Sequence, residues 1–454
     1  MAETVKLANK ATADLPEGYK VTDLGPLPEE WQVVKLETVF DVVNKKEREV
    51  SINYDETYLL LTVRLYGKGV TPRGIFPGSK IGLSKLYRTE DGDFVFSKID
   101  ARNGAWGFIP YELAGGLVSN DFPILRLNEG CALREFVELL LSQPKMWEPL
   151  RAIAVGTTNR RRIKPDHFFE LKAPLPPISE QRAIAHVLSA IRKALQESEK
   201  VLAAARELKK SLMRYLFTYG PVPVEEAERV PLKETEIGLM PEHWQIVRLE
   251  DVVQPIKQID PKKFPEQRFR YIDVSSIDNQ QLRVVGHQDV LGKYAPSRAR
   301  KLIKAGDVIF ATVRPYLKRI ALVTPEYDGQ ICSTAFCVLR ADGRSVMSNY
   351  LFSAVSHDRF VDSISEYQRG SSYPAVTDGD VLRGLIPLPP LSEQKGIASI
   401  LRTVDDKIQA EEVFKHALDV LFKALLHLLM TGRVRVKDLS LPETEGVASG
   451  ASRE

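Results

Sequence analysis

The sequence predicts an α+β protein in which two mixed α/β domains are separated by two long helices that pair as an antiparallel coiled coil, with an internal pseudo-two-fold repeat. Three observations predict this fold. The phrase PLPPISEQ at residues 174–181 returns as PLPPLSEQ at residues 387–394. After each phrase, apolar residues recur at spacings of three and four, which is typical of paired helices. Before each phrase, short β-branched segments lie between Gly, Pro, Asn and Asp, which is typical of strands.

Composition limits the class of protein. The chain has 454 residues and is 44% hydrophobic, enough for more than one core. Its 63 Lys and Arg against 60 Asp and Glu leave a net charge of +3, which does not demand a nucleic-acid partner but permits local segregation of charge. Cys131, Cys332 and Cys337 form neither a disulfide framework nor the spacing of a zinc site, and the seven histidines show no ligand-like cluster.

The N-terminal residues lack the apolar region of a secretion signal, and no apolar run approaches the roughly 18 residues that would cross a bilayer. We therefore expect a cytoplasmic protein with no membrane partner and no metal site.

The repeated phrase belongs to a longer duplication. Pro174 and Pro387 are 213 residues apart, and the same shift carries Trp31 in PEEWQVVKLETV onto Trp244 in PEHWQIVRLEDV. Agreement at both ends of a segment of this length indicates an internal repeat, with one copy near residues 20–219 and the other near 233–432.

Between these anchors the copies keep a common set of strands. WQVVKLETVF and YLLLTVRL in the first copy answer to WQIVRLEDVV and YIDVSSI in the second. GDFVFSK at Gly92 answers to GDVIFAT at Gly306, and FPILR at Phe122 to FCVLR at Phe336, now at a shift of 214. The residues that separate these strands, KIDARNGAWGFIP and VRPYLKRIALVTP, differ freely, so one scaffold is expected to carry two different surfaces.

A long helix is expected after each phrase, because its prolines force extended backbone, Ser179 or Ser392 can act as the N-cap, and Glu and Gln suit a first turn. A helix of about 39 residues would extend roughly 58 Å, too far to hide an apolar stripe in one small domain, so the two helices should pack on each other. The expected helix-pair interface consists of Ile184, Val187, Ile191, Val201, Leu208 and Leu212 with Ile397, Ile400, Val404, Phe414, Leu418, Leu421 and Leu425.

These patterns divide the chain into seven segments. They are an N-terminal tail (1–19), a first mixed α/β domain (20–173), a first long helix with its opening phrase (174–219), a linker (220–240), a second mixed α/β domain (241–386), a second long helix with its opening phrase (387–432) and a C-terminal tail (433–454).

The doubled phrase that opens a long helix resembles the conserved regions of the DNA specificity subunit of type I restriction-modification systems. The stretches GTTNRRRIKPDHFFELKAPLPP and GSSYPAVTDGDVLRGLIPLPP are similar to the close of that family's target recognition domains, with the Gly-Thr or Gly-Ser pair at Gly156 to Thr158 and at Gly370 to Ser372. The resemblance covers residues 20–432.

The resemblance implies a non-catalytic subunit that reads a bipartite, asymmetric DNA target, one half-site per target recognition domain, with the helices setting the spacer. The implied partners are double-stranded DNA, two methylation subunits and restriction subunits. No cofactor is implied in this chain, whereas S-adenosylmethionine, ATP and Mg²⁺ are implied in the partners.

The sequence contains no competing enzyme motif. No G-x-x-x-x-G-K-[ST] loop occurs, since GIFPGSK at Gly74 has the wrong spacing. PDHFFELK at Pro165 contains Pro-Asp and Glu-x-Lys, as in many metal-dependent nucleases, but three residues are too few to bring its halves together from neighbouring strands, and the second copy lacks it.

Basic residues interleaved with tyrosine indicate where DNA would bind, since Lys and Arg neutralise phosphates and Arg also reads guanine edges. A solvated basic face is the alternative interpretation. The candidates in the first copy are Lys80, Lys85, Arg88, Lys98, Arg102, Thr157, Thr158, Asn159, Arg160 and Arg161. Those in the second copy are Lys293, Arg298, Arg300, Lys301, Arg314, Tyr316, Lys318, Arg369, Ser371, Ser372 and Tyr373.

Two other classes of function stay open at this point. One is a bivalent scaffold for two protein partners, which would carry apolar anchors in the variable loops. The other is a stand-alone DNA-binding regulator that works without methylation partners.

Overall fold

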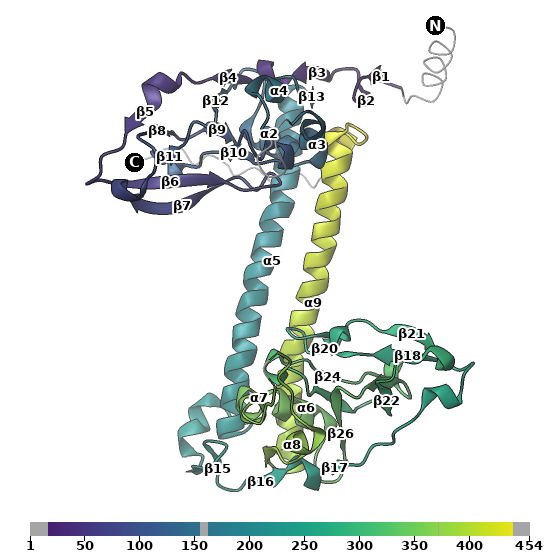
Figure 1. Ribbon diagram of the computed structural model, residues 1–454. Coiled ribbons are helices and arrows are strands. Elements are labelled where there is room, and N and C mark those ends of the chain that lie inside the picture. The colour runs from purple at the N-terminus through teal and green to yellow at the C-terminus, as the bar shows by residue number, and fades with distance from the viewer. Residues whose placement is uncertain (1–16, 155–161, 371, 439–454) are drawn as a thin grey trace, which may run out of the picture. The chain divides into compact units, whose positions relative to one another are not determined.

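The structure is a computed structural model that describes residues 17–154, 162–370 and 372–438 (Figure 1). The chain divides into two compact units. Unit 1 consists of residues 1–197 and 415–454, and unit 2 of residues 198–414. Each unit therefore combines one mixed α/β domain with parts of both long helices, and each has its own hydrophobic core.

The strands of unit 1 are β1 (Tyr19–Thr22), β2 (Gly25–Pro28), β3 (Gln32–Lys35), β4 (Phe40–Val42), β5 (Glu49–Ser51), β6 (Thr57–Val63), β7 (Val70–Pro77), β8 (Lys85–Arg88), β9 (Asp93–Phe96), β10 (Trp106–Phe108), β11 (Leu117–Val118), β12 (Ile124–Leu127) and β13 (Lys172–Leu175). Its short helices are α2 (Arg134–Leu141), α3 (Pro144–Ile153) and α4 (Pro165–Phe169).

The strands of unit 2 are β14 (Leu232–Lys233), β15 (Met240–Pro241), β16 (Gln245–Arg248), β17 (Val253–Gln254), β18 (Arg268–Ile272), β19 (Ile277–Asp278), β20 (Arg283–Val284), β21 (Gln288–Leu291), β22 (Ala299–Leu302), β23 (Val308–Ala311), β24 (Ile320–Leu322), β25 (Ile331–Ser333), β26 (Phe336–Ala341) and β27 (Leu385–Leu388). Its short helices are α6 (Ser348–Ser356), α7 (Asp358–Ser365) and α8 (Asp378–Leu382).

The two units repeat the same strand order. One sheet of unit 1 runs β10-β9-β12-β4, and its counterpart in unit 2 runs β24-β23-β26-β17. A second sheet contains β8-β11-β6-β7 in unit 1, extended by β5, and β22-β25-β18-β21 in unit 2. The register is repeated too, because Phe94 pairs with Leu125 and Val308 pairs with Leu339, both 214 residues later. The expected strand segments are therefore confirmed in both copies, except YIDVSSI, of which only Tyr271 and Ile272 belong to β18 and Val274–Ser276 form the 3-10 helix η9 before Ile277 starts β19.

An ion pair with a buried carboxylate occupies the same place in both four-stranded sheets. Asp93 lies 2.8 Å from Arg126 in unit 1, and Asp307 makes bonds of 2.8 and 2.7 Å to the guanidinium of Arg340 in unit 2. Burial raises the pKa of Asp93, and the charge of Arg126 opposes that rise. Both carboxylates are buried, and each also accepts a backbone hydrogen bond across the turn that enters its strand, from Glu90 N to Asp93 at 2.7 Å and from Lys304 N to Asp307 at 2.8 Å.

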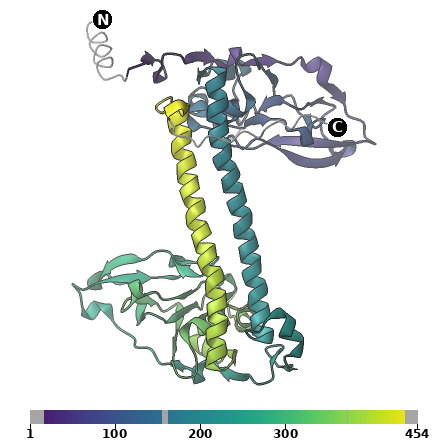
Figure 2. The same cartoon turned by 180° about the vertical axis from the view of Figure 1, so that it is seen from behind.

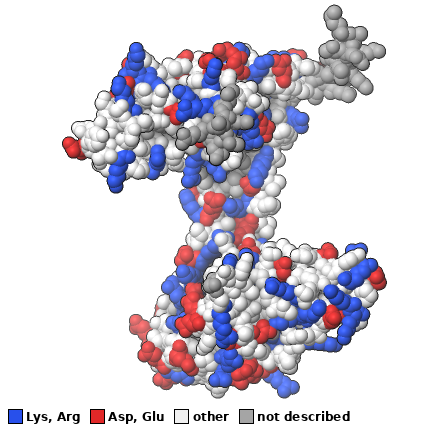
Figure 3. All heavy atoms as spheres, viewed as in Figure 1, with Lys and Arg blue, Asp and Glu red and all other residues white. Residues whose placement is uncertain are grey.

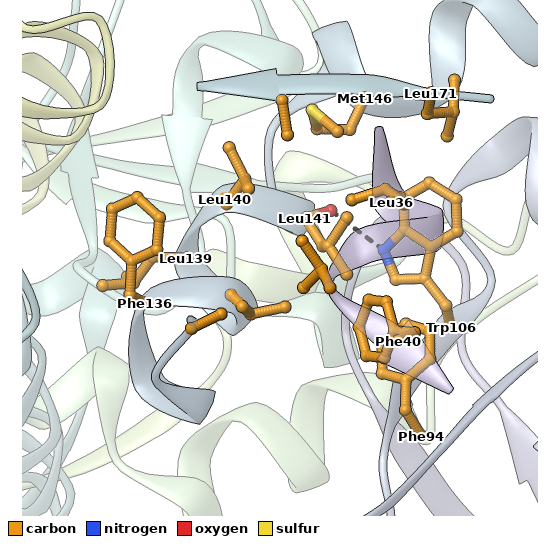
Figure 4. Close-up of a cluster of buried hydrophobic side chains, with 14 of the residues drawn as sticks. Leu36, Phe40, Phe94, Trp106, Phe136, Leu139, Leu140, Leu141, Met146 and Leu171 are labelled. Carbon is orange, nitrogen blue, oxygen red and sulfur yellow. Dashed lines mark hydrogen bonds between the residues drawn. The ribbon is translucent and has the colours of Figure 1, made fainter. Parts of the chain in front are cut away.

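Aromatic and aliphatic side chains fill the core of unit 1 between the four-stranded sheet and the helices (Figure 4). Phe94 packs on Phe40 with ring centres 4.6 Å apart, and Trp106 lies against α2, where its Nε1 donates to Leu141 O at 2.9 Å. The last turns of a long helix complete this core through Leu429 and Met430.

The two long helices are α5 (Ile178–Tyr219, 42 residues) and α9 (Leu391–Met430, 40 residues), both visible from two sides in Figures 1 and 2. Each begins one residue before the expected Ser179 or Ser392, so the N-cap prediction for these serines was wrong. The first helical bonds instead run from Glu180 N and Gln181 N to Pro177 O, at 2.9 Å each.

The expected contact stripe of the helices is partly wrong. Val201, Leu208, Ile400, Phe414 and Leu421, all expected in the interface, are exposed by 41%, 53%, 37%, 52% and 45%. At Val201 and Ile400 the apolar neighbour that follows is buried instead, whereas Leu208 lies between charged residues and Phe414 is exposed together with Val413. Other predicted positions are buried or half-buried, namely Ile184, Val187, Ile191, Leu212, Ile397, Val404, Leu418 and Leu425.

Leu202 and Leu401 show this shift most clearly. Both are buried, and each directly follows an exposed residue that the sequence analysis selected. At Val201 and Ile400, the buried residue is therefore the one that follows in the sequence. A spacing of three and four residues alone does not determine which of the two is buried.

The repeated phrase anchors each mixed domain to its helix through a glutamine. Gln181 Oε1 accepts from Leu133 N at 2.9 Å, and Gln181 Nε2 donates to Cys131 O at 2.9 Å and Pro176 O at 2.8 Å. Leu133 is the N-cap residue of α2, so a long helix and a short one share this buried amide.

Gln394 repeats the arrangement in unit 2. Its Oε1 accepts from Met347 N, the N-cap residue of α6, and its Nε2 donates to Ser345 O and Pro389 O, all at 2.9 Å. The two glutamines of the SEQ phrase are therefore structural residues with identical roles.

Candidate nucleic-acid interface

A turn and a loop from distant parts of the sequence meet in unit 2. The turn follows β23 and contains the 3-10 helix η11 (Pro315–Leu317), and the loop covers residues 369–375, of which position 371 lies outside the described residues. Arg314 N donates to Pro374 O at 2.8 Å, and Val376 N to Thr312 O at 2.9 Å. Two of the segments predicted to contact DNA are thus brought together.

Side chains strengthen this junction. Arg314 Nη2 donates to Ser372 O at 3.1 Å, and the Arg314 guanidinium lies 5.1 Å from the ring centre of Tyr373. Tyr373 and Tyr316 are exposed by 73% and 49%. The junction therefore presents two aromatic rings and a cation to solvent.

The turn holds two residues in left-handed backbone conformation. Arg314 has φ 49° and Lys318 has φ 51°, values that are uncommon for residues other than glycine. Backbone bonds from Leu317 N to Arg314 O and from Lys318 N to Pro315 O, at 2.9 and 2.8 Å, keep the turn closed. Strained positions of this kind often occur at functional sites.

The other cations of the junction have carboxylate partners. Lys318 forms an ion pair with Asp358, and Arg369 lies 3.7 Å from Asp380. Asp358 has a lowered pKa because Lys318 donates a hydrogen bond to it. Arg314 differs, since no carboxylate lies within ion-pair distance of it in the part of the chain that the structure describes, and its buried Nε has no hydrogen-bond partner there.

The remaining candidates of unit 2 are divided by their surroundings. Arg298 is exposed. Lys293 lies 3.4 Å from Glu266 and 5.4 Å from the centre of the Tyr294 ring, and Arg300 lies 3.2 Å from Asp260. Both ion pairs are solvent-accessible and therefore weak, so they do not prevent Lys293 and Arg300 from contacting a phosphate.

The prediction for Lys301 was wrong. We expected it to contact DNA, but its side chain is buried, with 4% of the residue exposed. Its Nζ donates to Phe336 O at 2.6 Å and forms an ion pair with Asp378. Strand alternation explains the difference, because successive side chains of β22 point to opposite faces of the sheet.

Unit 1 builds its turn at the same place from other residues. The 3-10 helix η4 (Ala101–Asn103) follows β9, and Gly104, with φ 68°, stands where unit 2 has Lys318. Ile163 N donates to Lys98 O at 2.9 Å, which matches the bond between Val376 and Thr312. The two copies thus hold different side chains on the same backbone contact.

Beside this turn the predicted candidate Lys98 has a lysine neighbour, Lys45, that the sequence analysis missed. Lys98 Nζ donates to Asn120 O at 3.0 Å, and Lys45 Nζ donates to the same oxygen at 3.3 Å while lying 4.6 Å from the centre of the Tyr87 ring. Burial, followed by the nearby charge of Lys98, lowers the pKa of Lys45 to about 8. Lys45 lies far from the basic stretch in the sequence, and no spacing motif marks it.

Other candidates of unit 1 are spread out. Lys80, Lys85 and Arg88 are exposed, and Lys85 pairs with Glu49 at 2.6 Å, whose hydrogen bond raises the pKa of the lysine. Arg102 is half-buried, and its Nε is buried without a partner among the described residues. The candidates Thr157, Thr158, Asn159, Arg160, Arg161 and Ser371 lie outside the described residues.

Charge is segregated on the surface of unit 2. Figure 3 shows Lys and Arg gathered over the end formed by β18, β21 and β22, and Asp and Glu gathered near β15. The acidic side corresponds to the exposed linker residues Glu225, Glu226, Glu228, Glu234 and Glu236. The small net charge of +3 is therefore compatible with a surface on which basic and acidic residues are separated.

Within residues 17–154, 162–370 and 372–438, no group of three or more His, Cys, Asp or Glu residues is placed to hold a metal ion. Nor does any helix in those ranges combine the length and hydropathy needed to span a bilayer.

Comparison with known proteins decides the family. The sequence profile of the type I restriction modification DNA specificity domain matches twice, at residues 28–204 and 241–418. The chain belongs to this family. The expectation of DNA recognition for a type I restriction-modification enzyme is thereby confirmed, and so is the non-catalytic assignment, since the curated relatives are specificity subunits.

Relatives of this specificity-domain family match over nearly the whole chain. The putative MjaX specificity subunit of Methanocaldococcus jannaschii is 26% identical, over 93% of this chain and 97% of its own length. The MjaVIII specificity subunit of the same organism is 24% identical, over 91% and 95%.

Solved structures agree in fold. A type I S subunit from M. genitalium is 16% identical, covers 88% of this chain and 96% of its own, and has a TM-score of 0.52. A chain from a type I R-M system, studied for complex assembly and conformational transition, is 20% identical, covers 90% and 99%, and has a TM-score of 0.51.

Proposed function

We propose that this specificity subunit reads an asymmetric, bipartite DNA target, with the mixed domain of unit 1 on one half-site and that of unit 2 on the other. One observation carries the proposal: two sheets with the same strand order and register hold different side chains on the same turn, Asp100 to Gly104 in one unit and Arg314 to Lys318 in the other. A scaffold repeated in backbone but not in surface suits two unlike half-sites.

We propose that α5 and α9 act as an antiparallel coiled-coil spacer that sets the distance between the half-sites. Contacts inside each unit support this. In unit 2, Arg206 pairs with Glu412 at 2.9 Å and Lys209 with Asp405 at 2.6 Å, so a later residue of α5 meets an earlier residue of α9. In unit 1, the Arg192 guanidinium lies 5.5 Å from the centre of the Phe422 ring.

The proposed domain limits follow this division of labour. The target recognition domains are residues 20–173 and 241–386, the spacer helices residues 174–219 and 387–432, the linker residues 220–240, and the tails residues 1–19 and 433–454. The proposed setting is the cytoplasm. The proposed partners are double-stranded DNA, two methylation subunits and restriction subunits, which would hold S-adenosylmethionine, ATP and Mg²⁺.

The test is to map methylated adenines in the source genome and then to measure binding of the complex of this subunit with its methylation subunits to the site found. We expect one bipartite site and an affinity that falls steeply with salt, because phosphate contacts release counterions. Binding without sequence preference or salt dependence would favour a protein-binding scaffold. Specific binding by this subunit alone, unaffected by methylation subunits, would favour a stand-alone regulator.

A further inference from the structure

Arg314 combines three features that together need an explanation. Its backbone is left-handed, its buried Nε has no hydrogen-bond partner among the described residues, and none of the carboxylates in those residues forms an ion pair with it. The first two of these features cost stability, since strained backbone and buried unsatisfied donors are both unfavourable. A residue kept in this state is suited to an acceptor that the chain itself does not supply.

The position of the guanidinium is fixed by two contacts. Nη2 donates one hydrogen to Ser372 O at 3.1 Å, and one face of the group lies 5.1 Å from the centre of the exposed Tyr373 ring. Nε–H is buried and so cannot reach an outside acceptor, which leaves the end-on edge of the guanidinium, formed by one hydrogen of Nη1 and one of Nη2. This edge carries two parallel donors.

A fixed pair of parallel donors matches the major-groove edge of guanine, which offers O6 and N7 as two acceptors. Phosphate can also accept two donors, but phosphate contacts tolerate flexible side chains and need no strained turn to aim them. Lys318 lies four residues further along the turn, and Arg369 lies across the junction. Both already form ion pairs, so they are less suited to contact guanine or phosphate.

We infer that Arg314 reads a guanine in the half-site of unit 2, with Tyr373 and the loop at Ser372 as positioning residues. This inference rests on the proposed function and adds to it the identity of one recognised base pair. Unit 1 has Asp100 at the matching turn position, so the inference applies to one half-site only.

The experiment uses the complex of this subunit with its methylation subunits and a set of duplexes in which each base pair of the mapped target is replaced singly. Wild type should lose affinity when one G·C pair of the unit 2 half-site is replaced. Arg314→Lys keeps the charge but not the fork, so it should lose most of that discrimination, which we expect to be roughly 10- to 100-fold. Discrimination at the other positions and the salt slope should stay as in wild type.

Two further variants separate positioning from charge. Tyr373→Phe keeps the ring and should retain discrimination, whereas Tyr373→Ala should lose part of it at the same base pair. Arg402→Lys on the exposed face of α9 is the matched control and should bind every duplex as wild type does.

The outcomes are distinct. If Arg314→Lys weakens all duplexes equally, Arg314 contacts phosphate and the inference is wrong. If it changes nothing, or if no G·C pair in that half-site matters, the inference is also wrong while the proposed function stands. If the wild-type complex itself prefers no sequence, the proposed function fails instead.

Discussion

The indole Nε1 of Trp31 donates a hydrogen bond to Glu180 Oε2 at 2.8 Å, across 149 residues of sequence. Trp244 Nε1 makes the same bond to Glu393 Oε2, also at 2.8 Å. Tryptophan and glutamate belong to the two sequence anchors that revealed the repeat, so the residues that mark the duplication also hold each mixed domain on the first turn of its helix.

Removing the glutamine beside this bond should destabilise one unit at a time. Gln181→Ala leaves three buried or partly buried backbone groups without a partner, so we expect a loss of about 3 kcal/mol in unit 1, and Gln394→Ala a similar loss in unit 2. Hydrogen exchange in a urea series gives the free energy of unfolding for each unit. Exposed Gln196 is the control, because its change to Ala should alter stability by less than about 0.5 kcal/mol. Equal effects of all three changes would exclude an anchoring role.

The segment after α9 is bound to unit 1 by Arg435. Its guanidinium donates hydrogen bonds to Glu180 and, at 2.7 Å, to Glu30, and these bonds raise the pKa of Arg435. Arg435→Ala leaves Glu180, which is largely buried, with one partner fewer, so unit 1 should lose about 2 kcal/mol. Exposed Arg433 lies two residues earlier, and Arg433→Ala should leave hydrogen exchange in unit 1 unchanged. Similar protection in both variants would show that the segment is not held by this pair.

Stability of unit 2 should depend on pH through His357. Its Nδ1 accepts from Arg359 N at 3.1 Å, and burial lowers its pKa from 6.5 to about 4. Because the folded pKa lies below the unfolded one, the stabilisation is complete above pH 6.5 and is lost as pH falls toward 4, by about 3 kcal/mol in total.

His357→Asn keeps an N-cap acceptor that does not titrate, so the decline of unit 2 stability between pH 6.5 and 4 should become shallower. His416→Asn, on the exposed surface of α9, should leave that decline unchanged. A pH profile of unfolding that is the same in wild type and His357→Asn would contradict the assignment.

Arg298 and Lys301, three residues apart, should behave differently. Arg298→Ala should weaken binding of all DNA sequences alike and reduce the salt slope by about one, because an exposed cation contacts phosphate. Lys301→Ala should instead destabilise unit 2, since it leaves Phe336 O and Asp378 without their buried partner. Salt-dependent affinity and hydrogen exchange, measured on both variants, separate the two roles. A purely electrostatic effect of Lys301→Ala on DNA binding, with intact stability, would refute its structural role.

Spacer length should follow helix length. Removing seven residues from the middle of α5 and seven from the facing part of α9 shortens a helix by about 10 Å, close to three base pairs of DNA. Binding to targets with altered spacers measures the effect, and the preferred spacer should become shorter. An unchanged spacer preference would mean that the helices do not measure the distance.

The strands could be predicted well because their alternating pattern is local and because the duplication shows each strand segment twice. The sequence predicts the long helices but not their phase, since Val201 and Leu202, or Ile400 and Leu401, are equally apolar and only packing selects between them. The basic candidates show the same limit. Lys301 and Arg300 are neighbours in one strand, and the pleat of the strand places only one of them inward. Lys45 reaches the Asn120 carbonyl from a 3-10 helix (Lys45–Arg48) that no sequence spacing connects to it.

The identical seating of the two mixed domains has an evolutionary consequence. Trp31, Glu180 and Gln181 make the same bonds as Trp244, Glu393 and Gln394, and the other partners in those bonds are backbone groups. Recombination that exchanges the DNA between such anchors would leave every one of these bonds intact. New recognition specificities could then arise by gene conversion or domain exchange in a single event, without a period in which the descendant protein fails to fold.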